Sequence, residues 1–224
     1  MDLKPEKREI LKFLSQIGVD TRFISYTAEN IYINNLRFSK FSRKKESIFK
    51  NRYPDIGIIR SSLFQKICSK SSKNLKNSLE PKETIYLLKP VDNLDQLINI
   101  ILEPYTRKYG ISIIQSEFTS INDAVEAGND NIVSRITLNN EVYGILDDLF
   151  NGDGIVSDNK DIKIISPLIN VSNEWINSFL DSGNIENKSE IKYEDLPQDF
   201  MLFLEDIVPD YKENILKVAT FLRN

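Results

Sequence analysis

Apolar residues near the start of the chain recur every three or four positions, which is the spacing of one helical face. This spacing predicts a helix over residues 5–17, which Gly18 would end. Residues 22–38 contain two short apolar runs and predict two short strands. Residues 39–52 are mostly basic and suit either a helix or a loop, whereas residues 61–79 predict a basic amphipathic helix.

After residue 83, short apolar runs alternate with amphipathic segments. The expected strands cover residues 84–88, 111–114, 132–133 and 162–165, and the expected helices cover residues 94–102, 121–127, 140–150 and 172–180. This alternation predicts an α/β fold with a mostly parallel, doubly wound sheet and helices on both of its faces. A terminal helical hairpin is expected over residues 197–223, with a break at Pro209.

The change in pattern also predicts how the chain is divided. A length of 224 residues suits one large domain or a domain with an appendage. We expect a small N-terminal α+β module over residues 1–57 and an α/β domain with terminal helices over residues 58–224. No apolar run approaches the roughly 18 residues that a membrane span needs, so no membrane association is expected.

Composition removes several kinds of chemistry. The chain has no histidine and a single cysteine, Cys68, so Ser-His and Cys-His nucleophile pairs and a four-ligand His/Cys zinc site cannot form within it. One cysteine also excludes an intrachain disulfide, and with the charged N-terminal residues 1–6 it indicates a cytoplasmic protein. Cys68 is either a thiol activated by Lys66 and Lys70 or a small buried apolar residue.

Charge is unevenly distributed. Residues 37–82 hold 13 Lys and Arg against 3 Asp and Glu, whereas the rest of the chain holds 16 against 30. Such a partition indicates a face that binds a polyanion such as RNA, although a solvated basic helix pair has the same composition. The candidate RNA-binding residues are Arg43, Lys44, Lys45, Arg60, Lys66, Lys70, Lys73 and Lys76.

One loop follows the first strand of the α/β pattern, at a position where doubly wound folds bind ligands. It reads Lys89-Pro90-Val91-Asp92-Asn93-Leu94 and leads into a helix. Before it come Arg60, Leu63-Phe64, Cys68 and a basic helix, and Ser166-Pro167-Leu168 lies downstream. In this order the chain resembles the PP-loop ATPases, and within them the tRNA 2-thiolation branch, whose loop reads Ser-Gly-Gly-x-Asp-Ser.

The sequence departs from that family at the positions that carry its chemistry. Pro90 has no N–H to offer a phosphate, and Val91 replaces a glycine that would allow close approach. Asn139 and Asn140 stand where the family has an acidic pair, and the family's catalytic cysteines and zinc ligands are absent. Residues 89–94 are then either an ordinary strand-to-helix turn or a remodelled site in which Lys89 meets a phosphate.

The resemblance, with these departures, implies a degenerate and non-catalytic PP-loop-like protein without a cofactor. It implies a role in tRNA 2-thiolation, as a tRNA-binding subunit or as the partner of an active paralogue or of a second copy. Two alternatives stay open. The chain is an active ATP-dependent tRNA-modifying enzyme with a remodelled loop, or it is a structural protein with no RNA role.

Overall fold

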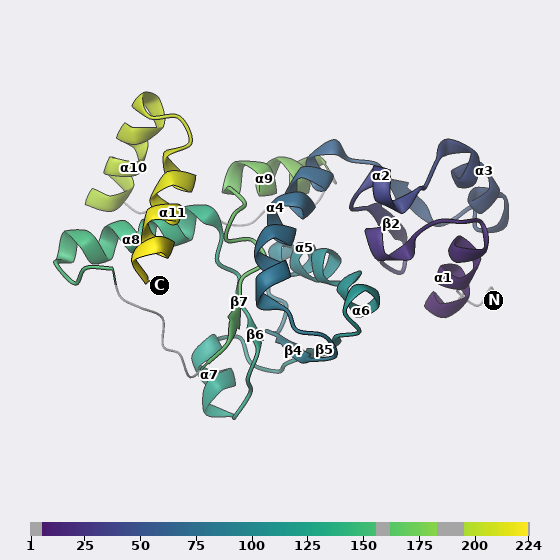
Figure 1. The fold of residues 1–224 in the computed structure, drawn as a ribbon, viewed down its shortest axis with the longest axis horizontal. Coiled ribbons are helices and arrows are strands. Elements are labelled where there is room, and N and C mark those ends of the chain that lie inside the picture. Colours follow the sequence, from purple (N-terminus) through teal and green to yellow (C-terminus); the bar gives the residue numbers. More distant parts are fainter. Residues whose placement is uncertain (1–5, 156–161, 183–194, 224) are drawn as a thin grey trace.

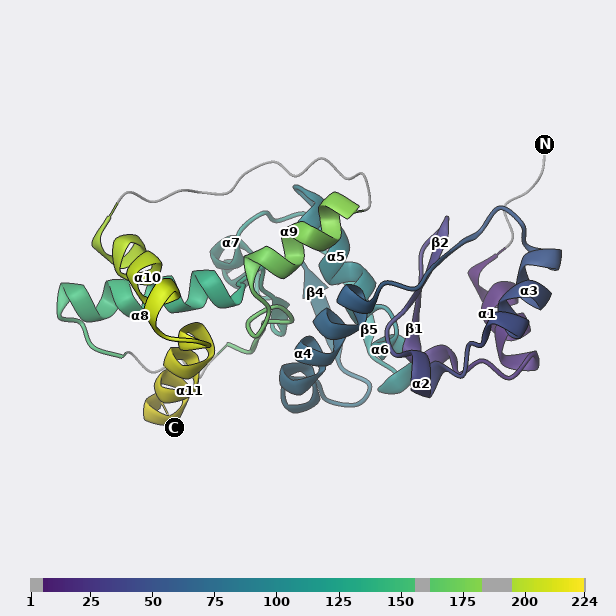
Figure 2. The ribbon, with the colours of Figure 1, turned by 90° about the horizontal axis from the view of Figure 1, so that it is seen from above.

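The computed structural model describes residues 6–155, 162–182 and 195–223 (Figure 1). The chain forms one three-stranded sheet and one four-stranded sheet, and helices pack around both. Seen from above, α1 and α3 lie at one end of the elongated molecule, and α8, α10 and α11 lie at the other end (Figure 2). Within the described residues, no helix is long and apolar enough to cross a membrane.

The N-terminal sheet is mixed. Its strands are β1 (Ile24–Tyr26), β2 (Asn30–Ile33) and β3 (Gly57–Ile59), with β1 antiparallel and β3 parallel to β2. The accompanying helices are α1 (Lys7–Gln16), the 3-10 turn η1 (Thr21–Phe23), α2 (Leu36–Ser39) and α3 (Arg43–Arg52). The basic segment is therefore helical, and the Ser42 hydroxyl caps α3 by accepting from Lys45 N at 3.4 Å.

Strand β3 was not expected from the sequence. Its run of three residues is too short to show a period, and its pairing with β2 is a contact between distant parts of the chain. A Cβ on Gly57 would lie 2.0 Å from Asn30 Oδ1, so glycine leaves room for the Asn30 side chain beside β3. The N-terminal sheet thus continues to Ile59, and a division of the chain near residue 57 remains a prediction.

The second sheet is wholly parallel, and it confirms the α/β fold. Its strands are β4 (Thr84–Leu87), β5 (Ser112–Gln115), β6 (Ile132–Val133) and β7 (Ile164–Ile165), in the order β5-β4-β6-β7. The chain first moves from β4 to β5 and then returns to the other side of β4. The strand order therefore reverses between β4 and β6, where doubly wound sheets bind their ligands.

Side chains alternate across this sheet. Ile85, Leu87 and Val133 join the main core with the helices on one face, whereas Leu88 and Ile132 pack with α7 on the other face. The helices of this part are α4 (Ser62–Ser78), α5 (Asn93–Leu102), α6 (Tyr105–Lys108), α7 (Ile121–Glu126), α8 (Leu138–Asn151) and α9 (Asn173–Ser182). Helices therefore cover both faces, as the alternating pattern predicts.

The terminal hairpin consists of α10 (Leu196–Ile207) and α11 (Tyr211–Arg223). Both helices pack on α8 through a separate small core that includes Val142, Leu146, Met201 and Leu216. The chain turns between them after Pro209, where Asp210 adopts a positive φ of 55°. This confirms the expected break, and Figures 1 and 2 show that α8, α10 and α11 form a bundle beside the sheet.

Candidate functional site

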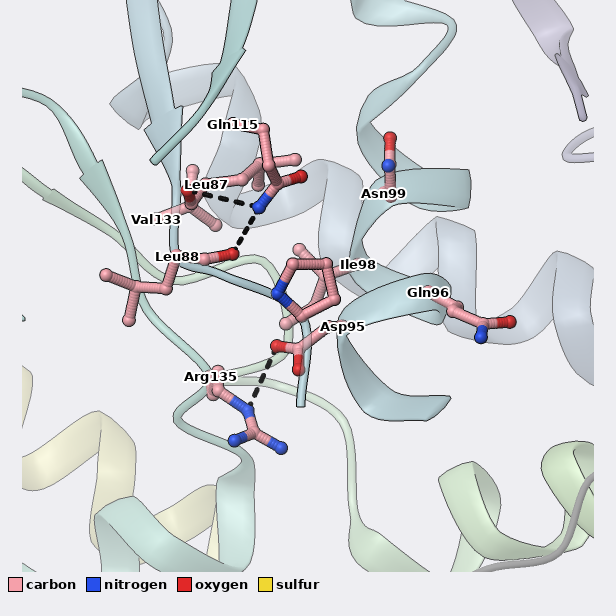
Figure 3. A pocket seen from close by; sticks show the side chains of 10 residues that line it. Leu87, Leu88, Asp95, Gln96, Ile98, Asn99, Gln115, Val133 and Arg135 are labelled. Atoms are coloured by element: carbon pink, nitrogen blue, oxygen red, sulfur yellow. Dashed lines mark hydrogen bonds and ion pairs between the residues drawn. The ribbon is translucent and has the colours of Figure 1, made fainter. Parts of the chain in front are cut away.

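The candidate site lies where β4 and β6 end and α5 begins (Figure 3). Strand β4 leads through Leu88 and Pro90 into α5, whose N-cap is Asp92. The segment after β6 brings Arg135 to the same place. This is the edge of the sheet at which the strand order reverses, so the fold presents a helix N-terminus at the position that a ligand would occupy.

Carboxylates of the chain itself already occupy the start of α5. Asp95 Oδ2 accepts hydrogen bonds from Val91 N at 2.7 Å and from Asp92 N at 3.2 Å. Asp92 Oδ1 accepts from Leu94 N at 2.9 Å, and the Asp92 side chain also accepts from the backbone N–H of Asp95, so that Asp92 and Asp95 form a capping box. These are the backbone donors that a helix N-terminus would offer to a bound anion.

The donor at the beginning of the loop is occupied as well. Lys89 N donates to the carbonyl of Phe118 at 2.8 Å, and Pro90 has no N–H. The side chains of Lys89 and Val91 are exposed and point away from the core. Among the described residues, the backbone donors at positions 89, 91, 92 and 94 thus all have partners within the chain. The loop is a strand-to-helix turn whose backbone donors form hydrogen bonds within the chain.

Arg135 is fixed against the same two carboxylates. Its Nη2 pairs with Asp92. Its Nε lies 3.1 Å from Asp95 Oδ1, as Figure 3 shows. The Asp95 side chain is 9% exposed and that of Arg135 is 32% exposed, so this cluster is only partly screened by solvent. Two carboxylates and one guanidinium leave a net negative charge at the helix start, which disfavours a phosphate group there.

The cavity beside this cluster is small. It measures about 50 Å³ and is lined by Leu87, Pro90, Ile98, Gln115 and Arg135, among others. The Gln115 amide donates to the carbonyl of Leu88 and closes one side (Figure 3). Ligand pockets have volumes of roughly 300–1,000 Å³, so this cavity accommodates water but not a nucleotide.

A wider depression adjoins the cavity and shares Leu88 and Arg135 with it. It measures about 320 Å³, is open to solvent, and is lined by Ser120, Ile136 and Asn140, among others. One of its polar groups is engaged locally, since Ser120 caps α7 through Asp123 N at 3.1 Å. This surface is shallow and lacks the enclosed apolar walls of most small-molecule sites.

The two asparagines at the positions of the family's acidic pair have structural roles. Asn139 Oδ1 accepts from Asn173 N at 3.0 Å, which satisfies a donor at the first turn of α9. Asn140 Oδ1 accepts from the Thr137 hydroxyl at 2.6 Å, and that hydroxyl caps α8. In the described residues, no group of three or more His, Cys, Asp or Glu is placed to hold a metal ion.

The predicted RNA-binding residues fall into separate groups. Arg43, Lys44 and Lys45 begin α3, at the N-terminal end of the molecule and far from α4 in both overall views (Figures 1 and 2). Arg43 pairs with Glu46 at 3.1 Å, and Lys45 Nζ donates to the carbonyl of Gly18 at 2.6 Å. Lys44 is exposed. The continuous basic stretch of the sequence is therefore not one continuous basic surface.

Arg60 has internal partners. Its Nε lies 2.6 Å from Glu46 Oε2, and its Nη2 donates to the carbonyl of Phe41 at 2.8 Å. The guanidinium also lies over the Phe41 ring, 5.5 Å from its centroid. Arg60 thus links the end of β3 to Phe41 and to Glu46 of α3.

The lysines of α4 form the second group. Lys66 and Lys70 lie beside the half-buried Trp175 of α9, with their Nζ atoms 5.9 and 5.7 Å from its ring. Lys70 also pairs with Glu213 of α11 at 3.1 Å. Two further lysines of this helix are exposed and make no ion pair with any described residue. They are Lys73 and Lys76.

Cys68 belongs to the core. It is buried, its Sγ accepts from Asn34 Nδ2 at 3.4 Å, and burial raises the pKa of its thiol to about 12. The neighbouring Lys66 and Lys70 do not activate it, because they point toward α9 and α11 on the other side of the helix. Of the two interpretations of Cys68, the buried apolar residue is confirmed.

Comparison with known proteins supports the fold but does not place the chain in a family. No family model matches the chain, and no curated protein is similar to it in sequence. A solved structure does match: the U34-tRNA thiolase NcsA from Methanococcus maripaludis, with its [4Fe-4S] cluster. The match has a TM-score of 0.52 and 13% identity, and it covers 77% of this chain and 82% of that one. At this identity the likeness shows a shared fold, which is the fold expected from the sequence.

Sequence reasoning identified the loop but missed two of the residues that fill it. Asp95 follows Asp92 by three positions, which is the spacing of a capping box, so a local signal was present. Arg135 gave no local signal, because its partner Asp92 lies 43 residues away in the sequence. Only the parallel pairing of β4 with β6 brings the two together.

Proposed function

We propose that this chain is a non-catalytic, PP-loop-like subunit in tRNA thiolation that binds tRNA and a protein partner and does not itself activate a nucleotide. The fold shared with a U34-tRNA thiolase supports the link to tRNA. One observation carries the non-catalytic part. The carboxylates of Asp92 and Asp95, locked by Arg135, take the place of a bound phosphate at the start of α5.

The chain also lacks the ligands for an iron–sulfur cluster of the kind that the thiolase structure contains. Such clusters are held by several cysteine thiolates. This chain has one cysteine, and the Cys68 thiol is buried with a pKa raised to about 12. Its own residues therefore do not fit a cluster.

Calorimetry with Mg-ATP tests the non-catalytic part. We expect no binding, because the loop donors are occupied and the cavity of about 50 Å³ is too small. Micromolar binding, or release of pyrophosphate in the presence of tRNA, would establish the alternative of an active enzyme with a remodelled loop. Asp95→Asn is a useful companion variant because it keeps an acceptor for the loop but removes one negative charge.

The exposed lysines of α4 are the surface that we propose for tRNA. Lys73 and Lys76 carry no ion pair to a described residue, and Lys66 and Lys70 extend the basic row beside Trp175. Phosphate contacts of this kind give affinity without sequence readout and weaken steeply with salt. Helix α3, which carries the other lysines, lies apart from α4 near the N-terminal end of the molecule (Figure 1).

Filter binding of a purified tRNA across salt concentrations tests this surface. We expect the double variant Lys73→Glu/Lys76→Glu to weaken binding and to lower the slope of log K against log salt by about 2. The matched control is Arg8→Glu/Lys12→Glu on α1, which makes the same change of charge at two exposed residues. If the wild type does not bind at low salt, the structural alternative without an RNA role is favoured.

A further inference from the structure

Helix α10 has two apolar faces, and only one of them is buried. Pro197 and Met201 are buried, and Met201 packs in the small core shared with α8 and α11. Another face includes four apolar residues that are 36% to 62% exposed. These residues, which we name the α10 seam, are Leu196, Phe200, Phe203 and Ile207.

The seam has the spacing of a coiled-coil interface. Its residues follow one another at intervals of four, three and four positions, which is the a/d pattern of a heptad repeat. Phe150 at the end of α8 extends it, since its ring centroid lies 5.6 Å from that of Phe200, which in turn lies 6.4 Å from Phe203. A row of exposed aromatic and aliphatic side chains of this kind marks an interaction surface.

The charges around the seam indicate what binds there. Residues 195–210 contain five Asp and Glu and no Lys or Arg. With the seam at a and d, Asp199 and Asp206 fall at the flanking g positions. Both are exposed, and neither makes an ion pair with a described residue. A helix laid on the seam would therefore bring its own e and g side chains against two unpaired carboxylates.

This charge pattern disfavours a second copy of the chain as the occupant. In a symmetric contact, the same surface meets itself, so two α10 helices would bring their acidic flanks together without a compensating base. Like charges at these positions are repulsive, whereas Lys or Arg on the partner would form interhelical ion pairs.

We propose that the α10 seam docks an amphipathic helix of a different polypeptide, one with an apolar a/d seam flanked by Lys or Arg. Phe200 and Phe203 are its aromatic anchors, and Asp199 and Asp206 select the basic flanks. The inference rests on the proposed function for the existence of a protein partner. It is tested without RNA or nucleotide, so either proposal can fail without the other.

The test uses a labelled heptad-repeat peptide with Leu at a and d and Lys at e and g, and a second peptide with Glu in place of Lys. Binding to the full chain is followed by fluorescence anisotropy at physiological salt. We expect the Lys peptide to bind, the Glu peptide not to bind, and Phe203→Ser to weaken the Lys peptide about tenfold or more. Phe203 is exposed, so this variant keeps its fold, which circular dichroism checks.

The matched control is Phe221→Ser, which removes an exposed phenyl ring from α11, outside the seam; Phe221 is 79% exposed and Phe203 is 59% exposed. It should bind the Lys peptide as the wild type does. No binding of the Lys peptide, equal binding of both peptides, or equal effects of the two Phe→Ser substitutions would each overturn the proposal. Light scattering that shows a dimer of the chain, dissociated by Phe203→Ser, would overturn it in favour of self-association.

Discussion

Removing the Asp95 carboxylate should destabilise the chain, because this side chain satisfies the start of α5. Asp95 is nearly buried, accepts from Val91 N at 2.7 Å and Asp92 N at 3.2 Å, and pairs with Arg135 at 3.1 Å. Loss of a helix-capping group costs about 0.5–2 kcal/mol. Loss of one partner of a half-buried guanidinium adds to this, but Asp92 remains, so we expect Asp95→Ala to lower the free energy of unfolding by about 2 kcal/mol.

The assay is equilibrium urea unfolding, followed by far-UV circular dichroism and by the fluorescence of Trp175, the only tryptophan. Asp95→Asn keeps an acceptor for the loop and loses the charge, so its effect should be intermediate. Gln96→Ala is the control, since Gln96 is an exposed neighbour on the same helix and its substitution should change stability by no more than about 0.5 kcal/mol. If Asp95→Ala is as stable as Gln96→Ala, the carboxylate does not hold the loop, and the argument for a self-filled anion site is wrong.

Two further predictions follow from pKa values. Burial raises the pKa of the Cys68 thiol to about 12. At neutral pH the thiol should therefore resist alkylation in the native chain and react readily in urea. Fast alkylation of the native chain would contradict the burial of Cys68. Although burial works against it, hydrogen bonds from Ser172 and Lys212 lower the pKa of Glu174 from 4.5 to about 2. Its contribution to stability is therefore full above about pH 4.5 and is lost as pH falls toward 2. Because Glu174 is half exposed, this contribution is about 1 kcal/mol at most. The Glu174→Gln variant should therefore lose less stability than the wild type between about pH 5 and pH 3. Equal losses would refute the lowered pKa of Glu174.

Much of the fold could be predicted because its signals are local. The period of apolar residues located β4, α5, α8 and the terminal hairpin to within a few residues. Strand β3 escaped prediction because three residues carry no period and its stability comes from pairing with β2. The order β5-β4-β6-β7 likewise depends on which strands pair, and neighbouring strands in this sheet are distant in sequence.

The candidate site was predicted in part. The sequence located the loop between β4 and α5, and Pro90 and Val91 argued against a phosphate cradle. Asp95 had a local signal in its capping-box spacing to Asp92, whereas Arg135 emerged only when β4 and β6 were side by side. Counting charges likewise identified a basic stretch but gave no way to know that Arg60 is held by Glu46.

The sequence by itself determined most of the longer helices and strands and which chemistry is absent, because helical and strand periods are local properties and a missing histidine or second cysteine is missing in every conformation. The tertiary structure decided which charges neutralise one another and which apolar faces stay exposed. Those outcomes depend on contacts such as Arg135 with Asp92, 43 residues apart, and on which face of α10 the bundle covers. Coulomb attraction and burial act between neighbours in space, and only the folded chain defines those neighbours.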